Sequence, residues 1–184
     1  MKLRHVLAAL AAAWIALAAA LTFAQDWPAK PVRVVIPFAA GSVAEAIFRK
    51  LVADAGMSET IVADSAGTHG YHIGEPPDPR AQALAAARGY DLSALRARRA
   101  ERGDFERFDL VVAMDRGHFA ILSRMAEAAT AHKLKLMMSY ARGSKEKDVP
   151  DPYYGGRQDF ERVLDMLEDA ARGLLDAIGG PAQG

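Results

Sequence analysis

The sequence predicts an α/β fold: a doubly wound, four-stranded parallel sheet flanked by helices. Short apolar runs rich in β-branched residues alternate with segments whose apolar residues recur at helical spacing. Loops rich in glycine and proline separate these segments. Strands that alternate with helices imply parallel βαβ units, and such sheets bind their ligands at the carboxyl ends of the strands.

The first half of the chain contains two predicted strands. Residues 32–38 form an apolar, β-branched run that predicts a buried strand. Ser42 and Glu45 have the spacing of a capping box, so a helix is expected to begin directly after Ser42. A second strand is predicted at 60–63. The segment 64–79 follows it, and its many glycines and prolines predict a loop.

The second half supplies the other two strands. A helix is predicted over 80–88, closed by Gly89. The third strand is predicted at 110–114, and Asp115 is placed to cap the helix that follows. The fourth strand is predicted at 133–140.

A long amphipathic helix is predicted at the C-terminal end. Its apolar residues recur at helical spacing, with charges on the opposite face, and we expect this stripe to dock on the core. The stripe consists of Phe160, Val163, Leu164, Leu167, Ala171, Leu174, Leu175 and Ile178.

Composition narrows the possible functions. The 184 residues, 51% hydrophobic and 25% charged, suit one domain with an extra terminal segment. Net charge is zero and no block of like charge stands out, so no nucleic-acid partner is expected. Arginines at 96–102, closely followed by Asp104 and Glu106, indicate a solvated mixed-charge surface.

Cysteine is absent from the sequence. This removes disulfides, thiolate metal sites and thiol nucleophiles together. The five histidines show no metal-ligand spacing on one helix face, and His69 and His72 are expected to be ordinary loop histidines. No metal or other cofactor is expected.

The N-terminus has the pattern of an export signal. A basic start with Lys2 and Arg4 precedes an apolar run at 6–24, which ends in small residues around Phe23. We expect residues 1–24 to be a secretory signal. The alternative is an uncleaved membrane anchor. The protein would be periplasmic if the signal is cleaved, without stable membrane association, and membrane-anchored if it is not.

Residues 1 to about 42 resemble the N-terminal part of periplasmic solute receptors of the tripartite tricarboxylate transporter type, and the segment 25–42 would be the receptor-like strand and loop that begin the mature chain. It carries Trp-Pro-Ala-Lys-Pro-Val-Arg and then Ile-Pro-Phe-Ala-Ala-Gly-Ser. In those receptors the corresponding loop contacts a carboxylate ligand. The rest of the chain is too short for the two-lobed body of that family.

From Val43 onward the chain resembles the low-molecular-weight protein tyrosine phosphatases, which implies their phosphotyrosine phosphatase I-like fold for residues 43–180. Several motifs arrive in family order. They are Ala44-Glu-Ala-Ile-Phe-Arg-Lys50, Asp64-Ser-Ala-Gly-Thr68, Gly74-Glu-Pro-Pro-Asp-Pro-Arg80, Asp104-Phe-Glu-Arg-Phe-Asp109, Ala113-Met-Asp115, Val149-Pro-Asp-Pro-Tyr-Tyr-Gly-Gly156 and Phe160-Glu-Arg-Val-Leu164.

The resemblance implies a catalytic loop that this chain lacks. In the family the first strand runs into a Cys-x5-Arg-Ser loop, whose thiolate attacks phosphorus while the arginine holds the phosphate oxygens. Counting back without gaps from Ala44 and Glu45 puts Val34 at the cysteine position and Ala40 at the arginine position. The break indicates a fusion point near residues 41–43.

Other site residues of the family are present. Asp151 matches the general acid that protonates the leaving tyrosyl oxygen. Tyr71, Tyr153 and Tyr154 would wall a slot for an aromatic ring, and Ser65 matches a serine that supports the phosphate loop.

These features predict a phosphatase homologue without catalytic activity. By resemblance its partner would be a phosphotyrosine protein or a small aryl phosphate, and it would be a monomer. The family itself is usually cytoplasmic. Two alternatives stay open: a gene-fusion product with no selected function, and a remnant periplasmic anion- or solute-binding module.

Overall fold

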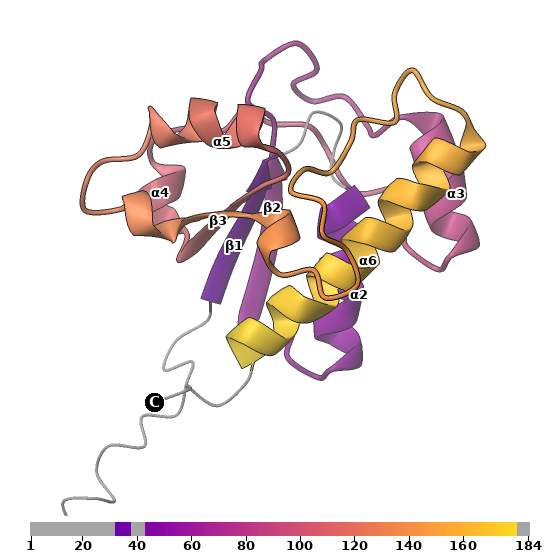
Figure 1. Ribbon diagram of the computed structural model, residues 1–184, viewed down its shortest axis with the longest axis horizontal. Coiled ribbons are helices and arrows are strands. Elements are labelled where there is room, and N and C mark those ends of the chain that lie inside the picture. The colour runs from indigo at the N-terminus through magenta and orange to yellow at the C-terminus, as the bar shows by residue number, and fades with distance from the viewer. Residues whose placement is uncertain (1–31, 38–42, 180–184) are drawn as a thin grey trace, which may run out of the picture. The chain divides into compact units, whose positions relative to one another are not determined.

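The structure is a computed structural model that describes residues 32–37 and 43–179 (Figure 1). All of them belong to one unit, Pro31–Gly184. The predicted signal segment 1–24 lies outside the described residues, and so does the segment 25–42 apart from its strand. The elements are β1 (Val32–Pro37), α2 (Val43–Asp54), β2 (Ile61–Ala66), α3 (Pro79–Ala87), α4 (Asp104–Arg107), β3 (Leu110–Ala113), α5 (Arg116–Ser123), η1 (Ala131–Lys133), β4 (Leu134–Leu136), η2 (Met137–Ser139) and α6 (Arg157–Gly179).

Four parallel strands form the sheet, in the order β2-β1-β3-β4. β1 pairs with β2 along its whole length, from Val32 opposite Ile61 to Pro37 opposite Ala66. On its other side, Val34 pairs with Leu110 of β3. All the strands therefore point their carboxyl ends to one edge, and the predicted doubly wound α/β fold is confirmed.

Helices cover both faces of this sheet. α2, α3 and α6 lie on one side in Figure 1, whereas α4 and α5 lie on the other. The side chains of β1 divide accordingly. Val34 belongs to the core cluster that contains α2 and α6, whereas Val35 packs in the cluster with Phe105 of α4 and Leu122 of α5. Successive residues of a strand face opposite sides, so a central strand buried on both faces reads as a continuous apolar run.

Most predicted elements are confirmed within a residue or two. The first strand ends at Pro37, one residue earlier than predicted, and a helix begins at Val43. Asp115 caps α5 as predicted, because its carboxylate accepts a 2.7 Å hydrogen bond from the backbone N–H of His118. Gly89, at φ +83°, ends α3 in the left-handed conformation that glycine tolerates.

The second strand is longer than predicted. It starts at Ile61 and continues through Asp64 and Ser65 to Ala66, so the first three residues of the predicted loop belong to the sheet. Pairing with β1, which continues to Pro37, supplies their backbone hydrogen bonds. The polar side chains of Asp64 and Ser65 concealed this extension, because each of them bonds to a partner from another element.

The predicted fourth strand at 133–140 was wrong over most of its length. Only Leu134–Leu136 is extended, and Met137–Ser139 forms a 3₁₀ turn. Met137 and Met138 are both buried in the same core cluster, and a turn allows this for consecutive residues, whereas successive side chains of a strand face opposite sides of the sheet. The hydroxyl of Ser139 donates to the carbonyl of Leu136 at 2.6 Å and stabilises the turn.

The C-terminal helix is confirmed and extends over Arg157–Gly179. It packs against α2, and near its C-terminal half Gly173 touches the backbone of Tyr140. A Cβ atom at position 173 would lie 2.0 Å from the carbonyl oxygen of Tyr140, so only glycine allows this approach. Along the described stretches of chain, no helix is long and apolar enough to cross a membrane.

Candidate functional site

A cavity of about 770 Å³ opens at the carboxyl end of β2. Two long loops rise from this edge of the sheet in Figure 1, one after β2 and the other before α6. The cavity is lined by Ser65, Ala66, Gly67, His69, Tyr71, His72, Ile73, Glu75, Pro76, Pro77, Asp78, Pro79, Ala97, Arg98, Asp151, Tyr153 and Tyr154. Its size and position are typical of a small-ligand or side-chain binding site in this fold class.

All five site residues predicted from the sequence line this one cavity. Ser65 is buried at the end of β2, whereas Asp151 is exposed on the loop before α6. Tyr71, Tyr153 and Tyr154 stand at the mouth with 83%, 51% and 96% of their surfaces exposed. The structure thus brings the predicted residues together across more than eighty positions of sequence. Their chemical roles remain predictions.

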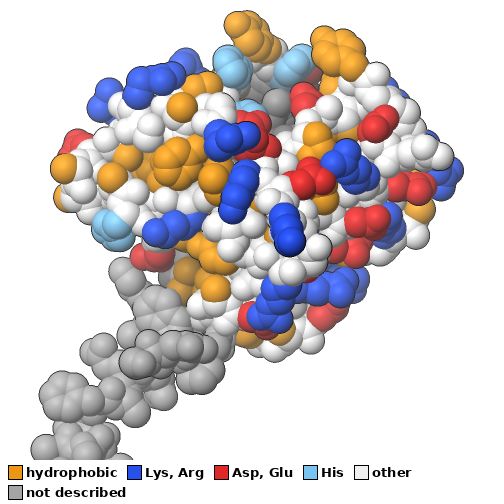
Figure 2. Space-filling model, viewed as in Figure 1, with side chains coloured by type: hydrophobic (Ala, Val, Ile, Leu, Met, Phe, Trp, Pro, Cys, Tyr) orange, Lys and Arg blue, Asp and Glu red, His pale blue; other side chains and the backbone are white. Residues whose placement is uncertain are grey.

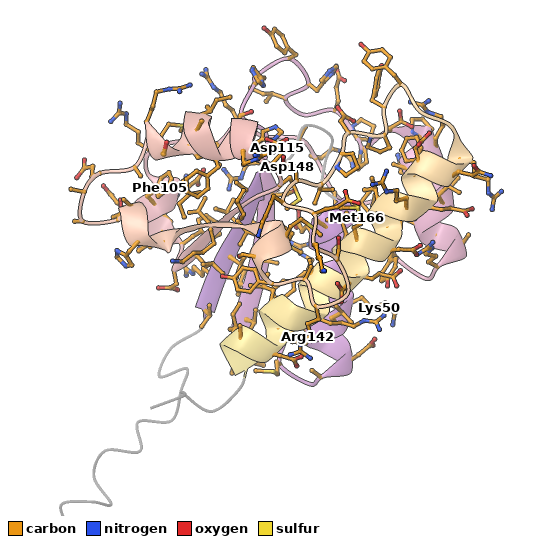
Figure 3. All side chains as sticks on the ribbon, in the orientation of Figure 1. Lys50, Phe105, Asp115, Arg142, Asp148 and Met166 are labelled. Carbon is orange, nitrogen blue, oxygen red and sulfur yellow. The ribbon has the colours of Figure 1, made fainter. Side chains whose placement is uncertain are left out.

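The loop that carries Asp151 is anchored at its start. The backbone N–H and guanidinium of Arg116 both donate to the carboxylate of Asp148, with the shortest contact at 2.7 Å. These hydrogen bonds hold the pKa of Asp148 below its usual value. Val149 donates its N–H to the carbonyl of Met114 at 2.9 Å, just past β3. Figure 3 shows Asp148 beside Asp115, where α5 begins.

Asp151 itself forms a local turn. Its Oδ1 accepts the backbone N–H of Tyr153 at 3.0 Å, an Asx-type turn that Pro152 favours. Within residues 43–179 its Oδ2 has no hydrogen-bond partner and no cation lies at ion-pair distance. This geometry leaves one carboxylate oxygen available to a ligand in the cavity.

Arg80 joins the Asp151 loop to α3. Its Nη2 donates to the carbonyl of Tyr153 at 3.1 Å and to Oδ2 of Asp78 at 2.8 Å. The guanidinium lies over the rings of Tyr153 and Phe160, 5.4 and 5.2 Å from their centroids. The hydrogen bond from Arg80 lowers the pKa of Asp78. One side chain therefore holds both sides of the cavity mouth.

Aromatic contacts order the rings at the mouth. Tyr153 and Tyr154 meet edge to face at 5.0 Å, and His69 stacks on Tyr71 at 5.9 Å with an interplanar angle of 11°. The backbone of the 69–79 loop is bonded to Ala97, whose carbonyl accepts the N–H of Gly74 at 2.7 Å, and the side chains of His72 and Glu75 meet at 2.8 Å. In Figure 2 hydrophobic side chains and histidines project together at this edge of the molecule.

Below the mouth, Ser65 is bonded to the first turn of α2. Its hydroxyl donates to Oε2 of Glu45 at 2.5 Å, and Oε1 of Glu45 pairs with Arg49 at 2.7 Å. Glu45 is only 2% exposed, and this burial raises the pKa of its carboxyl. The predicted capping partner, Ser42, lies outside the described residues. The capping-box spacing indicated a capping role for Glu45 and did not reveal its contact with Ser65.

Arg98 is not the solvated surface residue that the charge pattern predicted. Its guanidinium pairs with Asp64 at 2.8 Å and with Asp104 at 2.9 Å. Asp104 is 2% exposed and also accepts hydrogen bonds from Arg107 and from the N–H of Glu101. The expectation of a solvated mixed-charge surface is therefore wrong for Arg98 and Asp104, because the loop folds Arg98 back onto Asp64 at the end of β2.

The residues that line the cavity include more carboxylates than lysine or arginine side chains. Three lining residues carry carboxylates, Glu75, Asp78 and Asp151, whereas Arg98 is the only lysine or arginine in the described lining. Residues 38–42, which connect β1 to α2 but lie outside the described part, read Phe-Ala-Ala-Gly-Ser and contain no ionisable side chain. Among the described residues, no group of three potential metal ligands exists.

Val34, which the ungapped count places at the family's cysteine position, is not among the residues that line the cavity. Val34 is fully buried in the core between the sheet and the helices α2 and α6. It pairs with Ala63, two register steps before Ser65, which lines the cavity. Ala40, at the arginine position, lies outside the described residues.

Comparison with known sequences decides the family. A family model described as "Low molecular weight phosphotyrosine protein phosphatase" matches residues 39–183. The chain belongs to this family. A low molecular weight protein-tyrosine-phosphatase of Streptomyces coelicolor is 48% identical over 145 residues, which cover 77% of this chain and 88% of the relative. The human low molecular weight phosphotyrosine protein phosphatase is 39% identical over 73% of this chain and 85% of its own length.

Solved structures of the family share the fold. YfkJ from Bacillus subtilis superposes with a TM-score of 0.77 and 34% identity, covering 84% of this chain and 98% of its own. A protein tyrosine phosphatase from Entamoeba histolytica, crystallised with Hepes in the active site, gives a TM-score of 0.76 and 32% identity. It covers 82% of this chain and 97% of its own.

Proposed function

We propose that this chain is a member of the low molecular weight phosphatase family that does not hydrolyse phosphate monoesters. The observation that carries the proposal is the complete absence of cysteine from the sequence. Phosphoryl transfer through a covalent intermediate requires an activated nucleophile, and a thiolate is far better suited to it than an unactivated hydroxyl at neutral pH. Ser42, the one hydroxyl in the segment between β1 and α2, has no evident base beside it in the sequence.

The anion clamp is missing as well. A bidentate arginine holds the charge of a phosphoryl group in the transition state. Arg98 lines the cavity, but it is shared by the carboxylates of Asp64 and Asp104. Releasing it toward a phosphate would leave the buried Asp104 with one cation fewer, which is costly.

Without a nucleophile, Asp151 has no leaving group to protonate. Loss of the nucleophile from a catalytic unit costs on the order of 10⁶ in kcat. General acid catalysis contributes only about 10²–10⁴-fold and cannot restore turnover by itself. We therefore propose that Asp151 and the tyrosines still form the family's substrate-binding wall but take no part in catalysis.

The origin of the break is proposed to be a fusion near residues 41–43. The family match begins at residue 39, two residues before the proposed junction, which supports a break after β1. The register of β1 also supports it, since the aligned cysteine position falls on buried Val34. A fusion product without selected function and a remnant periplasmic solute-binding module remain the alternatives.

Export is proposed from the pattern at residues 1–24. N-terminal sequencing of protein recovered from a bacterial periplasmic fraction tests it. We expect the mature chain to begin at Gln25. Recovery of the whole chain from the cytoplasm would contradict export.

Hydrolysis of p-nitrophenyl phosphate by purified protein tests the proposed inactivity. Two variants that introduce a cysteine and an arginine serve as comparisons in this assay. The first, Val34→Cys with Ala40→Arg, should stay inactive because position 34 is buried away from the cavity. The second replaces the five residues 38–42 by the eight-residue Cys-x5-Arg-Ser loop of the family, beginning at the end of β1, and it should gain turnover that Asp151→Asn lowers. Turnover by the unaltered chain above a buffer blank would contradict the proposal.

A further inference from the structure

The segment 96–107 carries more positive charge than its own acidic residues balance. It contains five arginines and three acidic residues. Asp104 is buried against Arg98 and Arg107, and Glu101 also pairs with Arg107. Two of the acidic residues are therefore used by Arg98 and Arg107, and the other arginines of the segment receive no ion pair from them.

Three exposed arginines are left over, Arg96, Arg99 and Arg102. Among the residues that the structure describes, no carboxylate lies at ion-pair distance from any of them. Arg96 donates to the carbonyls of Ser93 and Leu95, whereas the side chains of Arg99 and Arg102 form no hydrogen bond within those residues. A guanidinium binds a carboxylate with two parallel hydrogen bonds, so unpaired, exposed arginines are suited to an acidic partner.

Backbone hydrogen bonds hold this segment in a fixed position. The N–H of Gly67 donates to the carbonyl of Arg98 at 2.7 Å, and the N–H of Ala100 donates to the carbonyl of Gly67 at 2.8 Å. The carbonyl and the N–H of Ala97 bond to residues 74–75, at 2.7 and 3.0 Å. Side chains carried on an ordered backbone lose less conformational entropy when a partner binds.

Arg99 lies at the rim of the cavity. A Cβ atom placed on Gly70 would lie 3.6 Å from Cδ1 of Ile73 and 3.8 Å from Cδ of Arg99, so these two side chains flank the same glycine. Ile73 is 61% exposed and lines the cavity together with Tyr71. Exposed apolar side chains bordered by arginine are typical of protein interfaces, which have an apolar centre and a polar rim.

From these observations we propose that Arg96, Arg99 and Arg102 form a docking surface for an acidic segment of a polypeptide partner, beside the cavity mouth. A polypeptide fits this surface better than a nucleic acid or an anionic membrane. The carboxylates of Glu75 and Asp151 line the same cavity and would repel a continuous array of phosphates. The three arginines are not part of the cavity lining, so docking does not depend on whether the cavity hydrolyses phosphate esters.

Titration of the isotope-labelled full chain with two synthetic peptides, followed by NMR, tests the proposal. One twelve-residue peptide alternates Glu and Asp around a central Leu, and the other carries Gln and Asn at the same positions. We expect the acidic peptide to shift the amides of residues 67–75 and 96–102 most, and to bind at least about fivefold more tightly than the neutral one. Equal binding of the two peptides, or shifts confined to other residues, would overturn the proposal.

The salt and pH of the titration are chosen to isolate the arginines. At about 0.15 M salt the screening length is roughly 8 Å, so charges far from the bound peptide contribute little to its affinity. At about pH 7.5 an unperturbed histidine is mostly uncharged, so the arginines supply the positive charge of this surface.

A double charge reversal locates the docking. Arg99→Glu with Arg102→Glu should leave the melting temperature unchanged and weaken the acidic peptide at least about fivefold. Lys145→Glu with Lys147→Glu is the matched control. It changes the net charge equally, at two exposed lysines that have no acidic partner in the described stretches of chain, and should weaken the peptide less than twofold. Equal weakening by the two double variants would show that net charge alone matters and would overturn the proposal.

Two further probes test the other anionic occupants. They are vesicles of phosphatidylglycerol with phosphatidylcholine, and a twelve-nucleotide single strand of DNA. We expect neither to bind more tightly than the acidic peptide under the same conditions. Tighter binding of either one that is lost in Arg99→Glu with Arg102→Glu would assign the surface to a membrane or a nucleic acid. Phosphate release measures the proposed inactivity separately, so the two proposals fail independently.

Discussion

The hydroxyl of Ser65, at the end of β2, donates a 2.5 Å hydrogen bond to the carboxylate of Glu45 in the first turn of α2. Both side chains are buried, at 5% and 2% exposure. The contact joins the floor of the cavity to the helix that follows the family's phosphate loop. Both residues belong to motifs that resemble those of the family, within the residues that its model matches.

Glu45 should give the protein a measurable pH dependence. Burial raises the pKa of Glu45 above its ordinary value of 4.5, so the folded state holds this proton more tightly than the unfolded state. Its contribution to stability is therefore complete below about pH 4.5 and is lost as the pH rises through the folded pKa. The free energy of unfolding of the unaltered chain, minus that of Glu45→Gln, should fall between pH 4.5 and pH 8.

Denaturant unfolding at several pH values measures this difference. Asp54→Asn, which removes an exposed carboxylate from the same helix, is the matched control. A difference between the unaltered chain and Glu45→Gln that does not change across this range would show that burial of Glu45 does not govern its titration.

Asp104 should be important for stability. It is 2% exposed and is held by Arg98, Arg107 and a backbone N–H. Removing one partner of a buried ion pair leaves the others uncompensated and typically costs about 3–5 kcal/mol. We expect Asp104→Ala to lower the free energy of unfolding by about 3–5 kcal/mol. Glu106→Ala, two residues along and exposed, should change it by less than about 0.5 kcal/mol.

Gly173 should not tolerate a methyl group. Replacing a helix-interior glycine with alanine normally stabilises a helix by about 1 kcal/mol. Here the new Cβ would lie 2.0 Å from the carbonyl oxygen of Tyr140, so Gly173→Ala should instead destabilise by about 1–3 kcal/mol. Gly103→Ala, where a Cβ meets no atom within 4 Å, is the control. Stabilisation by Gly173→Ala in thermal melts would contradict the packing of α6 on this loop.

Arg80 should order the Asp151 loop without contributing much to global stability. It is half exposed and bonds the carbonyl of Tyr153. In Arg80→Ala we expect hydrogen exchange at the amides of Tyr153 and Tyr154 to become several-fold faster, with an unchanged unfolding midpoint. Arg172→Ala, an exposed arginine on the far part of α6, should leave this exchange unaltered. If exchange at these amides were equally fast in Arg80→Ala and Arg172→Ala, Arg80 would not be the residue that orders the loop.

Sequence patterns predicted the helices and strands whose buried positions recur at a regular spacing. Periodicity located α6, and a β-branched run located β1, because both bury a regular set of positions. The turn at Met137–Ser139 was not predicted, because two adjacent buried methionines fit neither the helical nor the strand period. The residues Tyr71 and Asp151 were assigned through family motifs, and no periodicity would have placed them in one cavity.

Two features needed three-dimensional information. The arginine-rich stretch was expected to be a solvated surface because acidic residues closely follow its arginines, but Arg98 pairs with Asp64, which lies 34 positions earlier in the sequence. Likewise, an ungapped count placed the missing cysteine at Val34, and only the register of β1 with β2 shows that this position is buried below the cavity.

Steady-state hydrolysis of a phosphotyrosine peptide tests the central claim most directly, with the purified chain and its Asp151→Asn variant assayed side by side. We predict that phosphate release by both proteins equals that of buffer at every substrate concentration. Saturable release by the unaltered chain, reduced by Asp151→Asn, would show that this fold hydrolyses phosphate esters without a cysteine and would contradict the account.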